Sequence, residues 1–296
     1  MKNKKLLKFN KKLTWVLMAC PIVFAALQTV LLTCFYDAPM RLYAHSGTAF
    51  ALIYNVLLFV FVIGALALYY FTDCDHISGK VANTTIFTRI FGILSSVSLL
   101  AKGVFDLIPF IKDYTQTYKM LGLKEYIEQV FASKQQRFLL LSAIVCFVAF
   151  VYLALVSIMP KGQNQLKTWL GCVTIVWHIL YLLATYFDMT GPLNDPIRLI
   201  NQFALVGMMM FLTVEIRFLC EIPKKGLYIG ISIGAFTLLL CSSVATIVYM
   251  IASNSITSNI VLNIYQLVSA GYVFTRLMAQ LKSFEIKAPE TPVVNK

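Results

Sequence analysis

Between Lys225 and Arg276 the chain reads GLYIGISIGAFTLLLCSSVATIVYMIASNSITSNIVLNIYQLVSAGYVFT, which is 50 residues without a charged side chain. About 20 apolar residues suffice for one helix to cross the roughly 30 Å hydrocarbon layer of a membrane. The stretch is therefore long enough for two crossings. The polar string 253–259 divides it, because Ser, Asn and Thr side chains favour turns and helix caps. We expect two antiparallel membrane helices here.

The rest of the chain repeats this pattern of long uncharged stretches between charged residues. Uncharged stretches of 24, 31, 23 and 20 residues begin after Lys12, Arg41, Arg137 and Lys167. Two further apolar segments, 89–111 and 199–220, contain a few charges but are long enough for one crossing each. The spans do not show the alternating period of membrane β-strands. The sequence therefore predicts eight transmembrane helices.

The composition excludes most other classes of protein. Hydrophobic residues make up 59% of the 296 residues and charged residues 13%, whereas an average soluble domain has roughly a quarter charged residues. We predict an all-α polytopic integral membrane protein, an eight-helix bundle forming one membrane domain over 1–296. The expected helices cover about 13–36, 47–72, 89–111, 137–160, 168–187, 198–220, 226–252 and 258–281, with short tails at 1–12 and 282–296.

Basic residues predict the orientation, because short cytoplasmic loops are enriched in Lys and Arg. Six lysines precede the first span. With that end in the cytoplasm, 17 basic residues lie at the inner side and 7 at the outer side, and Lys102 lies within a span. Arg276 is counted among the inner, carboxyl-terminal charges. Both termini are therefore predicted to be cytoplasmic, in a bacterial-type cell membrane.

The net charge of +12 follows from this topology and does not indicate a nucleic-acid partner. The same charges predict attraction of the cytoplasmic rim to anionic lipid headgroups, at about 1 kcal/mol per basic side chain near the surface. Membrane lipid is thus the expected partner, and a protein partner or a second copy of the chain is an open alternative through helix packing.

The outer loop between Lys112 and Arg137 is longer than the others. In its segment 119–134, apolar residues recur at helical spacing, at Leu123, Tyr126, Ile127, Val130 and Phe131. This pattern predicts an amphipathic helix. Such a helix either lies on the outer membrane surface or covers an outward-facing cavity.

Three glycines at intervals of four residues, Gly226, Gly230 and Gly234, form a stripe on the seventh span. Small residues at this spacing let another helix approach closely, which helps to hold helices together in lipid. The stripe predicts a packing face, either for a neighbouring helix of the same bundle or for a second copy.

Charged side chains within the spans are costly and are candidates for function. Lys102 and Asp106 are four residues apart and share one helix face, so they can form a structural pair or contact a solute or ion. Glu215 has no partner on its own helix, and we expect it to contact water or a basic group of another helix, with His178 as the favoured partner. His178 itself is either a hydrogen-bonded core residue or a ligand or proton carrier.

Uncharged amides add further candidates for a ligand or ion pathway. They lie in the outer halves of their helices, at Asn201, Asn263 and Gln266. Such side chains also hydrogen-bond one membrane helix to another, and both interpretations stay open.

The sequence gives little support to catalysis, and we expect no cofactor and no metal. It lacks the zinc-protease, serine-hydrolase and phosphate-loop motifs. Its three histidines lie in different regions. The string Asp73, Asp75 and His76 could bind a divalent cation, although a solvated acidic turn is the favoured interpretation. The seven cysteines show no C-x-x-C pattern and are expected to pack as small apolar residues.

Three functions are compatible with these features. The leading hypothesis is non-enzymatic handling or transport of a small solute, ion or lipid through a polar intramembrane cavity. The second is a scaffold, sensor or accessory subunit in which the polar groups only join helices. The third is an intramembrane enzyme, which requires carboxylates and His178 to converge.

Overall fold

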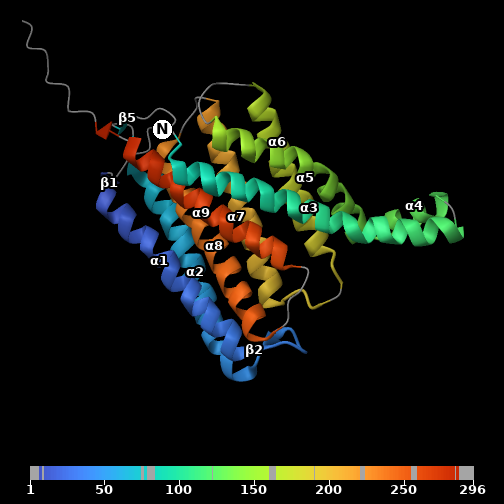
Figure 1. Ribbon diagram of the computed structural model, residues 1–296. Coiled ribbons are helices and arrows are strands. Elements are labelled where there is room, and N and C mark those ends of the chain that lie inside the picture. The colour runs from blue at the N-terminus through green and yellow to red at the C-terminus, as the bar shows by residue number, and fades with distance from the viewer. Residues whose placement is uncertain are drawn as a thin grey trace, which may run out of the picture.

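The computed structural model describes residues 7–8, 10–74, 77–78, 84–121, 123–159, 165–189, 191–220, 224–254, 259–283 and 285–286. Within these ranges the helices are α1 (Lys11–Phe35), α2 (His45–Phe71), α3 (Ile86–Leu121), α4 (Leu123–Ala132), α5 (Lys134–Ile158), α6 (Gln165–Tyr186), α7 (Pro196–Leu219), α8 (Lys225–Ala252) and α9 (Ile260–Ser283) (Figure 1). Six two-residue strands form the pairs β1–β4 (Leu7–Lys8 with Thr72–Asp73), β2–β3 (Tyr36–Asp37 with Leu42–Tyr43) and β5–β6 (Ile77–Ser78 with Glu285–Ile286).

Eight of these helices, all except α4, are long and apolar enough to cross a membrane. The shortest, α6, has 22 residues, which corresponds to about 33 Å at 1.5 Å per residue. This length covers the hydrocarbon layer of a bilayer. The chain is therefore an all-α multi-pass membrane protein with eight spans, as the sequence predicts.

Side-chain caps mark the beginnings of several of the described helices. Asn10 accepts hydrogen bonds from the backbone N–H groups of Lys12 and Leu13 at the start of α1. Ser133 caps α5 in the same way. Asp195 caps α7 and is followed by Pro196 at the first helical position. These caps satisfy amide groups that have no partner within the helix.

Helix α8 lies at the centre of one half of the bundle, in contact with α1, α2, α7 and α9. Its serine and threonine hydroxyl groups are buried, and three of them bond to the carbonyl one turn earlier, as Ser232 does to Tyr228 O and Thr237 to Ile233 O. Buried hydroxyls are satisfied in this way without a partner helix. Helices α3, α5 and α6 pack together as the other half and join the first through contacts of α3 with α9 and of α6 with α7.

The glycine stripe of α8 lies against α2. A Cβ atom on Gly226 would lie 2.3 Å from the carbonyl oxygen of Tyr69, and one on Gly230 would lie 3.1 Å from that of Ala65. A Cβ on Gly234 would lie 3.2 Å from the Val62 side chain. The partner of this packing face is thus a neighbouring helix of the same chain.

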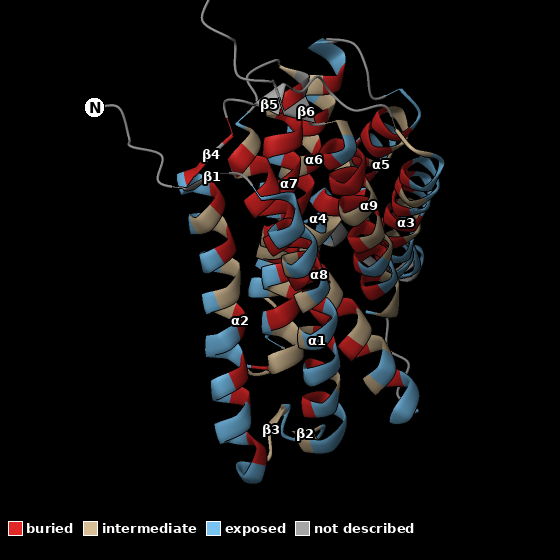
Figure 2. Cartoon of the chain, turned by 90° about the vertical axis from the view of Figure 1, so that its left-hand side faces the viewer, coloured by how far each residue is buried: buried red, intermediate tan, exposed pale blue. Residues whose placement is uncertain are grey.

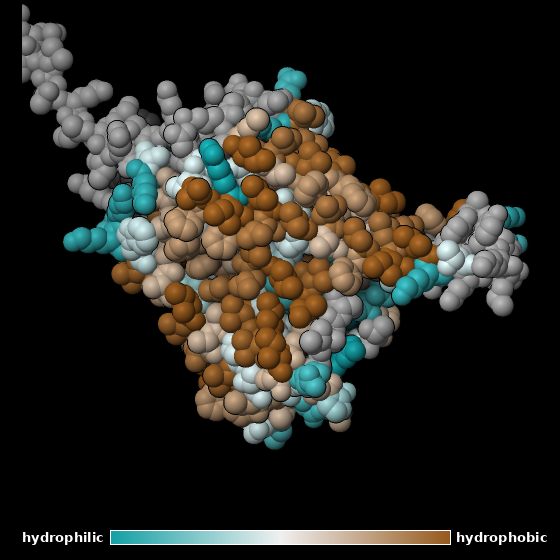
Figure 3. Space-filling model, viewed as in Figure 1, coloured by the Kyte–Doolittle hydropathy of each residue, from teal (hydrophilic) through white to brown (hydrophobic). Residues whose placement is uncertain are grey.

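The outer surface of the bundle is apolar. Figure 2 shows that the exposed faces of α1 and α2 point away from the bundle, whereas most of α8 is buried. Large apolar side chains such as Val16, Ile22 and Ile53 are 58–63% exposed, and apolar residues cover much of the face in Figure 3. Such exposure is expected where lipid, not water, surrounds the helices.

The two ends of the bundle differ. We call the end at which α1 begins and α9 finishes the proximal end; it also carries the pairs β1–β4 and β5–β6. The opposite, distal end carries the pair β2–β3 (Figure 2). Both described chain ends therefore lie at the proximal end. That this end faces the cytoplasm stays a prediction.

The largest departure from the expected bounds is in α3. This helix has 36 residues and continues to Leu121, beyond the predicted end at 111, and its last turns project with α4 away from the other helices (Figure 1). The amphipathic segment 119–134 forms α4 over Leu123–Ala132, with Ile127 and Phe131 46% and 50% exposed. The other spans begin and end within three residues of the predicted positions.

Candidate functional site

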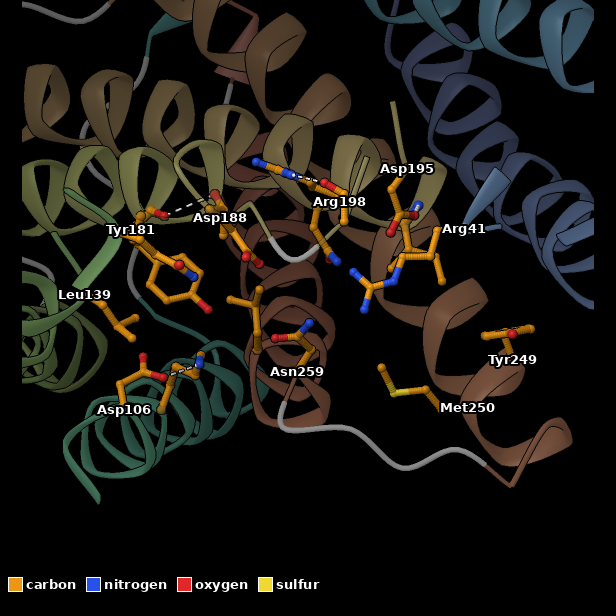
Figure 4. A pocket seen from close by; sticks show the side chains of 18 of the residues that line it. Arg41, Asp106, Leu139, Tyr181, Asp188, Asp195, Arg198, Tyr249, Met250 and Asn259 are labelled. Atoms are coloured by element: carbon orange, nitrogen blue, oxygen red, sulfur yellow. Dashed lines mark hydrogen bonds and ion pairs between the residues drawn. The ribbon is translucent and has the colours of Figure 1, made fainter. Parts of the chain in front are cut away.

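A polar cavity of about 590 Å³ lies at the distal end of the bundle. Ligand sites in proteins commonly have about 300–1,000 Å³. Its walls come from the six helices α3 and α5 to α9 and from the α1–α2, α6–α7 and α8–α9 loops. It contains six ionisable side chains besides its tyrosines. The bases are Lys102, Arg41 and Arg198, and the acids are Asp106, Asp188 and Asp195 (Figure 4).

Lys102 and Asp106 form one wall of the cavity. They are four residues apart on α3, and Lys102 Nζ lies 2.5 Å from Asp106 Oδ1. The two side chains are only 4% and 11% exposed. Lys102 Nζ also lies 5.0 Å from the centre of the Tyr181 ring, a geometry in which the ring face attracts the cation. Each charge at this depth therefore has an opposite charge or a ring beside it.

Arg41 and Asp195 form the opposite wall. Asp195 accepts a hydrogen bond from the backbone N–H of Ile197 at 2.9 Å and from the hydroxyl of Tyr36 at 3.3 Å. Arg41, at a positive φ of 52° in the β2–β3 turn, interacts electrostatically with Asp195. Figure 4 shows Arg41, Asp188 and Asn259 directed towards the same space.

Asp195 and its hydrogen-bond donor Tyr36 have shifted pKa values. Burial raises the pKa of Asp195 above its ordinary value of 3.8, and the hydrogen bonds from Ile197, Arg198 and Tyr36 and the charge of Arg41 only partly offset this effect. The pKa of Tyr36 is also raised, first by burial and then by the charge of Asp195. Tyr36 therefore stays a neutral hydrogen-bond donor over the physiological pH range.

Arg198 joins the α6–α7 loop to α7. Its Nη2 donates to the carbonyl of Tyr186 at 2.6 Å, and its Nη1 lies 3.5 Å from that of Gly191. Its Nε is buried without a hydrogen-bond partner among the described residues. The side chain therefore holds the loop in place and keeps one donor unused.

The floor of the cavity is a group of uncharged polar residues. Asn201 lines the cavity, and its Oδ1 lies 2.7 Å from Ser242 Oγ, which lies 2.8 Å from Gln266 Oε1. Gln266 is fully buried, as is Asn263, whose amide donates to the carbonyl of Asn259 at 3.0 Å. These bonds connect α7, α8 and α9 beneath the cavity.

His178 lies outside the cavity lining and is fully buried. Its Nδ1 lies 2.8 Å from the carbonyl of Thr174, and its Nε2 lies 2.9 Å from the hydroxyl of Tyr265. Trp177 and Tyr265 pack beside it. Because a carbonyl oxygen only accepts, Nδ1 carries a proton, and in the neutral ring Nε2 then accepts from the Tyr265 hydroxyl.

Glu215 has a basic partner from another helix, as expected. The partner is Arg276, so the prediction that His178 is the partner is wrong. Arg276 of α9 donates from Nε to Glu215 Oε1 at 2.6 Å, and both side chains are 2% exposed. Tyr152, Tyr228 and Tyr272 lie within electrostatic range of this pair. The prediction that Arg276 is a charge of the cytoplasmic rim is therefore also wrong, because the Arg276 side chain on α9 is buried inside the bundle.

The structure thus divides the predicted site residues into three groups. Lys102, Asp106 and Asn201 line the distal cavity. His178, with Tyr265, lies deeper. Glu215, with Arg276, lies in the proximal half. The described cavity contains Lys102 but does not connect it with His178 and Glu215. Glu215 and His178 also have different hydrogen-bond partners. The convergence of carboxylates and His178 that the enzyme hypothesis requires is therefore not present among these residues.

Sequence reasoning missed Arg276 and the cavity residues Arg41, Asp188, Asp195 and Arg198. A signal for Arg276 exists, because the apolar pattern continues after it through Leu277, Met278 and Ala279, which places it inside the span. The other four lie in loops or at a helix start, where a charged residue is ordinary. Their sequence neighbours give no sign that they converge.

The described residues include no group of three or more His, Cys, Asp or Glu side chains that could hold a metal ion. Asp75 and His76, proposed with Asp73 as a cation site, lie outside the described residues. None of the seven cysteines forms a disulfide bond within the described part of the chain. Comparison with known proteins adds no function: no family model, no curated protein and no solved structure matches the chain. Its class, a multi-pass membrane protein, therefore rests on the helices themselves.

Proposed function

We propose that this protein is a solute transporter of a cell membrane that binds a small polar molecule without net charge, of the zwitterionic kind, in the distal cavity. The observation that carries the proposal is the set of three basic and three acidic side chains around one cavity of about 590 Å³. Lys102 and Asp106 lie within a span, where charged side chains are costly, and four further charges from loops and a helix start converge on the same cavity.

The balance of charges favours the zwitterionic class. Arg41 and Arg198 can bind a carboxylate, for which the planar guanidinium is well suited. Asp188 and Asp195 can accept hydrogen bonds from an ammonium group. The opposite charges compensate one another, so a solute with a strong net charge gains no long-range attraction from the cavity.

The packing of the proximal half is consistent with a state in which the solute cavity opens at the distal end and is closed towards the proximal end. Below the cavity floor, Leu99, Trp177, Tyr265 and Phe211 are at most 1% exposed. The pair Glu215–Arg276 lies beyond this layer. A transporter exposes its site to one side at a time, and the observed arrangement fits one of these states.

The experiment measures binding first and transport second. Thermal unfolding in detergent is followed with small zwitterionic amino acids, dicarboxylates and polyamines, and the zwitterions should raise the unfolding temperature most. Arg41→Gln and Arg198→Gln should abolish the rise, whereas Lys282→Gln at the proximal end should preserve it. Equal responses to all three classes, or an unaltered response of both arginine variants, would refute the assignment.

The competing function is a membrane sensor or scaffold. It is favoured by the buried polar groups of the proximal half, which bond one helix to another. Uptake of the bound zwitterion into proteoliposomes distinguishes the two functions, because a sensor binds the solute but does not accumulate it.

A further inference from the structure

A second hollow of the molecule is apolar and faces lipid. This acyl groove, of about 680 Å³, is lined by side chains of α1, α3, α8 and α9 and by Thr85. Met18 and Ile22 of α1 lie on one side, and Phe87 and Phe91 of α3 lie on the other. Because α1 packs along α8 and α3 packs along α9, the groove runs between α1 and α3, with α9 between them in Figure 1.

The groove is longer than the hydrocarbon part of one membrane leaflet. On α9 its lining extends from Leu267 to Lys282, and these 15 steps correspond to about 22 Å along a helix. One leaflet contributes half of the roughly 30 Å hydrocarbon thickness. The groove therefore begins at the proximal membrane boundary and reaches past the midplane, which suits a single fatty acyl chain lying along the membrane normal.

The proximal mouth of the groove is basic. Lys282, which is exposed, lies at its end. Lys11 and Lys12 at the start of α1 and Arg89 in the first turn of α3 are exposed at the same end of the bundle. Basic pockets between membrane helices bind the phosphate groups of anionic lipids.

We propose that the groove is a specific site for an anionic phospholipid of the proximal leaflet. One acyl chain lies between α1 and α3 on α9, and the headgroup phosphate contacts Lys282. The apolar lining supplies affinity for the chain, and the basic mouth selects the headgroup. The site is independent of the solute cavity, which lies at the other end of the bundle.

Native mass spectrometry of the detergent-solubilised protein tests the site. The protein is titrated with phosphatidylglycerol and with phosphatidylcholine of identical acyl chains. We expect one phosphatidylglycerol molecule to be retained after the others dissociate, with roughly tenfold higher affinity than phosphatidylcholine, since one or two basic side chains contact the headgroup. Equal retention of both lipids would overturn the proposal.

Two variants separate the chain site from the headgroup site. Val268→Trp fills the groove and should remove the retained lipid, whereas Val176→Trp, on the 44% exposed Val176 of α6 outside the groove, should leave it in place. Lys282→Gln should abolish the preference for phosphatidylglycerol. If Val268→Trp does not fold, Lys282→Gln decides alone, and a preference that survives this change contradicts the proposal.

Discussion

The buried pair Glu215–Arg276 shows how a single ion pair is stabilised within a membrane bundle. Two charges in hydrocarbon are tolerated when each neutralises the other and their remaining hydrogen-bonding groups are near polar atoms. Here the tyrosines at positions 152, 228 and 272 surround the pair. The pair joins α7 to α9, which otherwise make few contacts with each other.

Glu215→Gln should lower the free energy of unfolding by about 3–5 kcal/mol, because it leaves the Arg276 cation buried without its carboxylate. The double variant Glu215→Leu with Arg276→Met should recover most of this loss, since it removes both charges. Thermal unfolding in detergent measures the effect. Additive losses in the double variant would show that the two residues do not stabilise each other.

Asp195 predicts how solute binding depends on pH. Its pKa is raised above 3.8 by burial, so the carboxylate becomes neutral at a higher pH than an ordinary Asp. As the pH falls through this raised pKa, the attraction for Arg41 and for an ammonium group is lost. We expect solute affinity, measured by calorimetry, to fall as the pH is lowered through the raised pKa of Asp195.

Asp195→Asn should weaken binding at neutral pH and remove the fall in affinity on acidification, which we call the acid limb. Asn also caps helices well, so α7 should still form. Asp37→Asn, in β2 and outside the cavity lining, serves as the control and should keep the limb. An acid limb that persists in Asp195→Asn would assign it to another group.

At the scale of elements, α8 shows why glycine is required for close helix packing. The Gly226 Cα approaches the backbone of α2 at Tyr69 so closely that a side chain cannot enter without moving one helix. In lipid, such close contacts replace the hydrophobic effect that drives helix association in water.

Gly226→Ala should therefore lower the free energy of unfolding by about 1–3 kcal/mol through overpacking. Gly64 of α2 is the matched control, because a Cβ there would meet nothing within 4 Å. Gly64→Ala should be neutral or stabilise α2 by about 0.5–1 kcal/mol, because Ala has a higher helix propensity than Gly. Equal losses in both variants, measured by thermal unfolding, would contradict the packing role.

At the scale of the whole molecule, the prediction concerns orientation. With the proximal end in the cytoplasm, the solute cavity opens to the outside and the acyl groove lies in the inner leaflet. Once the buried Arg276 is left out, 16 basic residues at the proximal side against 7 at the distal side support this orientation. A reporter that functions only in the cytoplasm, fused after Lys296, should therefore be active.

Cysteine labelling of intact cells checks the same orientation independently. In a chain without its native cysteines, Leu193→Cys in the distal α6–α7 loop should react with an impermeant maleimide, because Leu193 is 57% exposed. Lys224→Cys, exposed at the proximal end, should react only after the cells are opened. The reverse pattern would invert the molecule and both proposed sites with it.

The number and order of the spans could be predicted from the sequence alone. Uncharged runs of 20 or more residues are local signals, because the thickness of the bilayer sets the length of each span. The pairing of Lys102 with Asp106 is equally local, since residues four apart share a helix face. The glycine stripe indicated a packing face for the same reason, although not which helix it contacts.

The partners of these surfaces depend on the tertiary structure. In lipid, the outward and inward faces of a helix are both apolar, so hydrophobic periodicity does not identify its neighbours. Arg276 meets Glu215 across 61 positions. Arg41 comes within electrostatic range of Asp195 because Tyr36 of β2 hydrogen-bonds to Asp195 at the start of α7 and so brings the β2–β3 turn there. The cavity exists because six helices and their loops bring isolated charges together, and only the packing of the bundle brings them into one place.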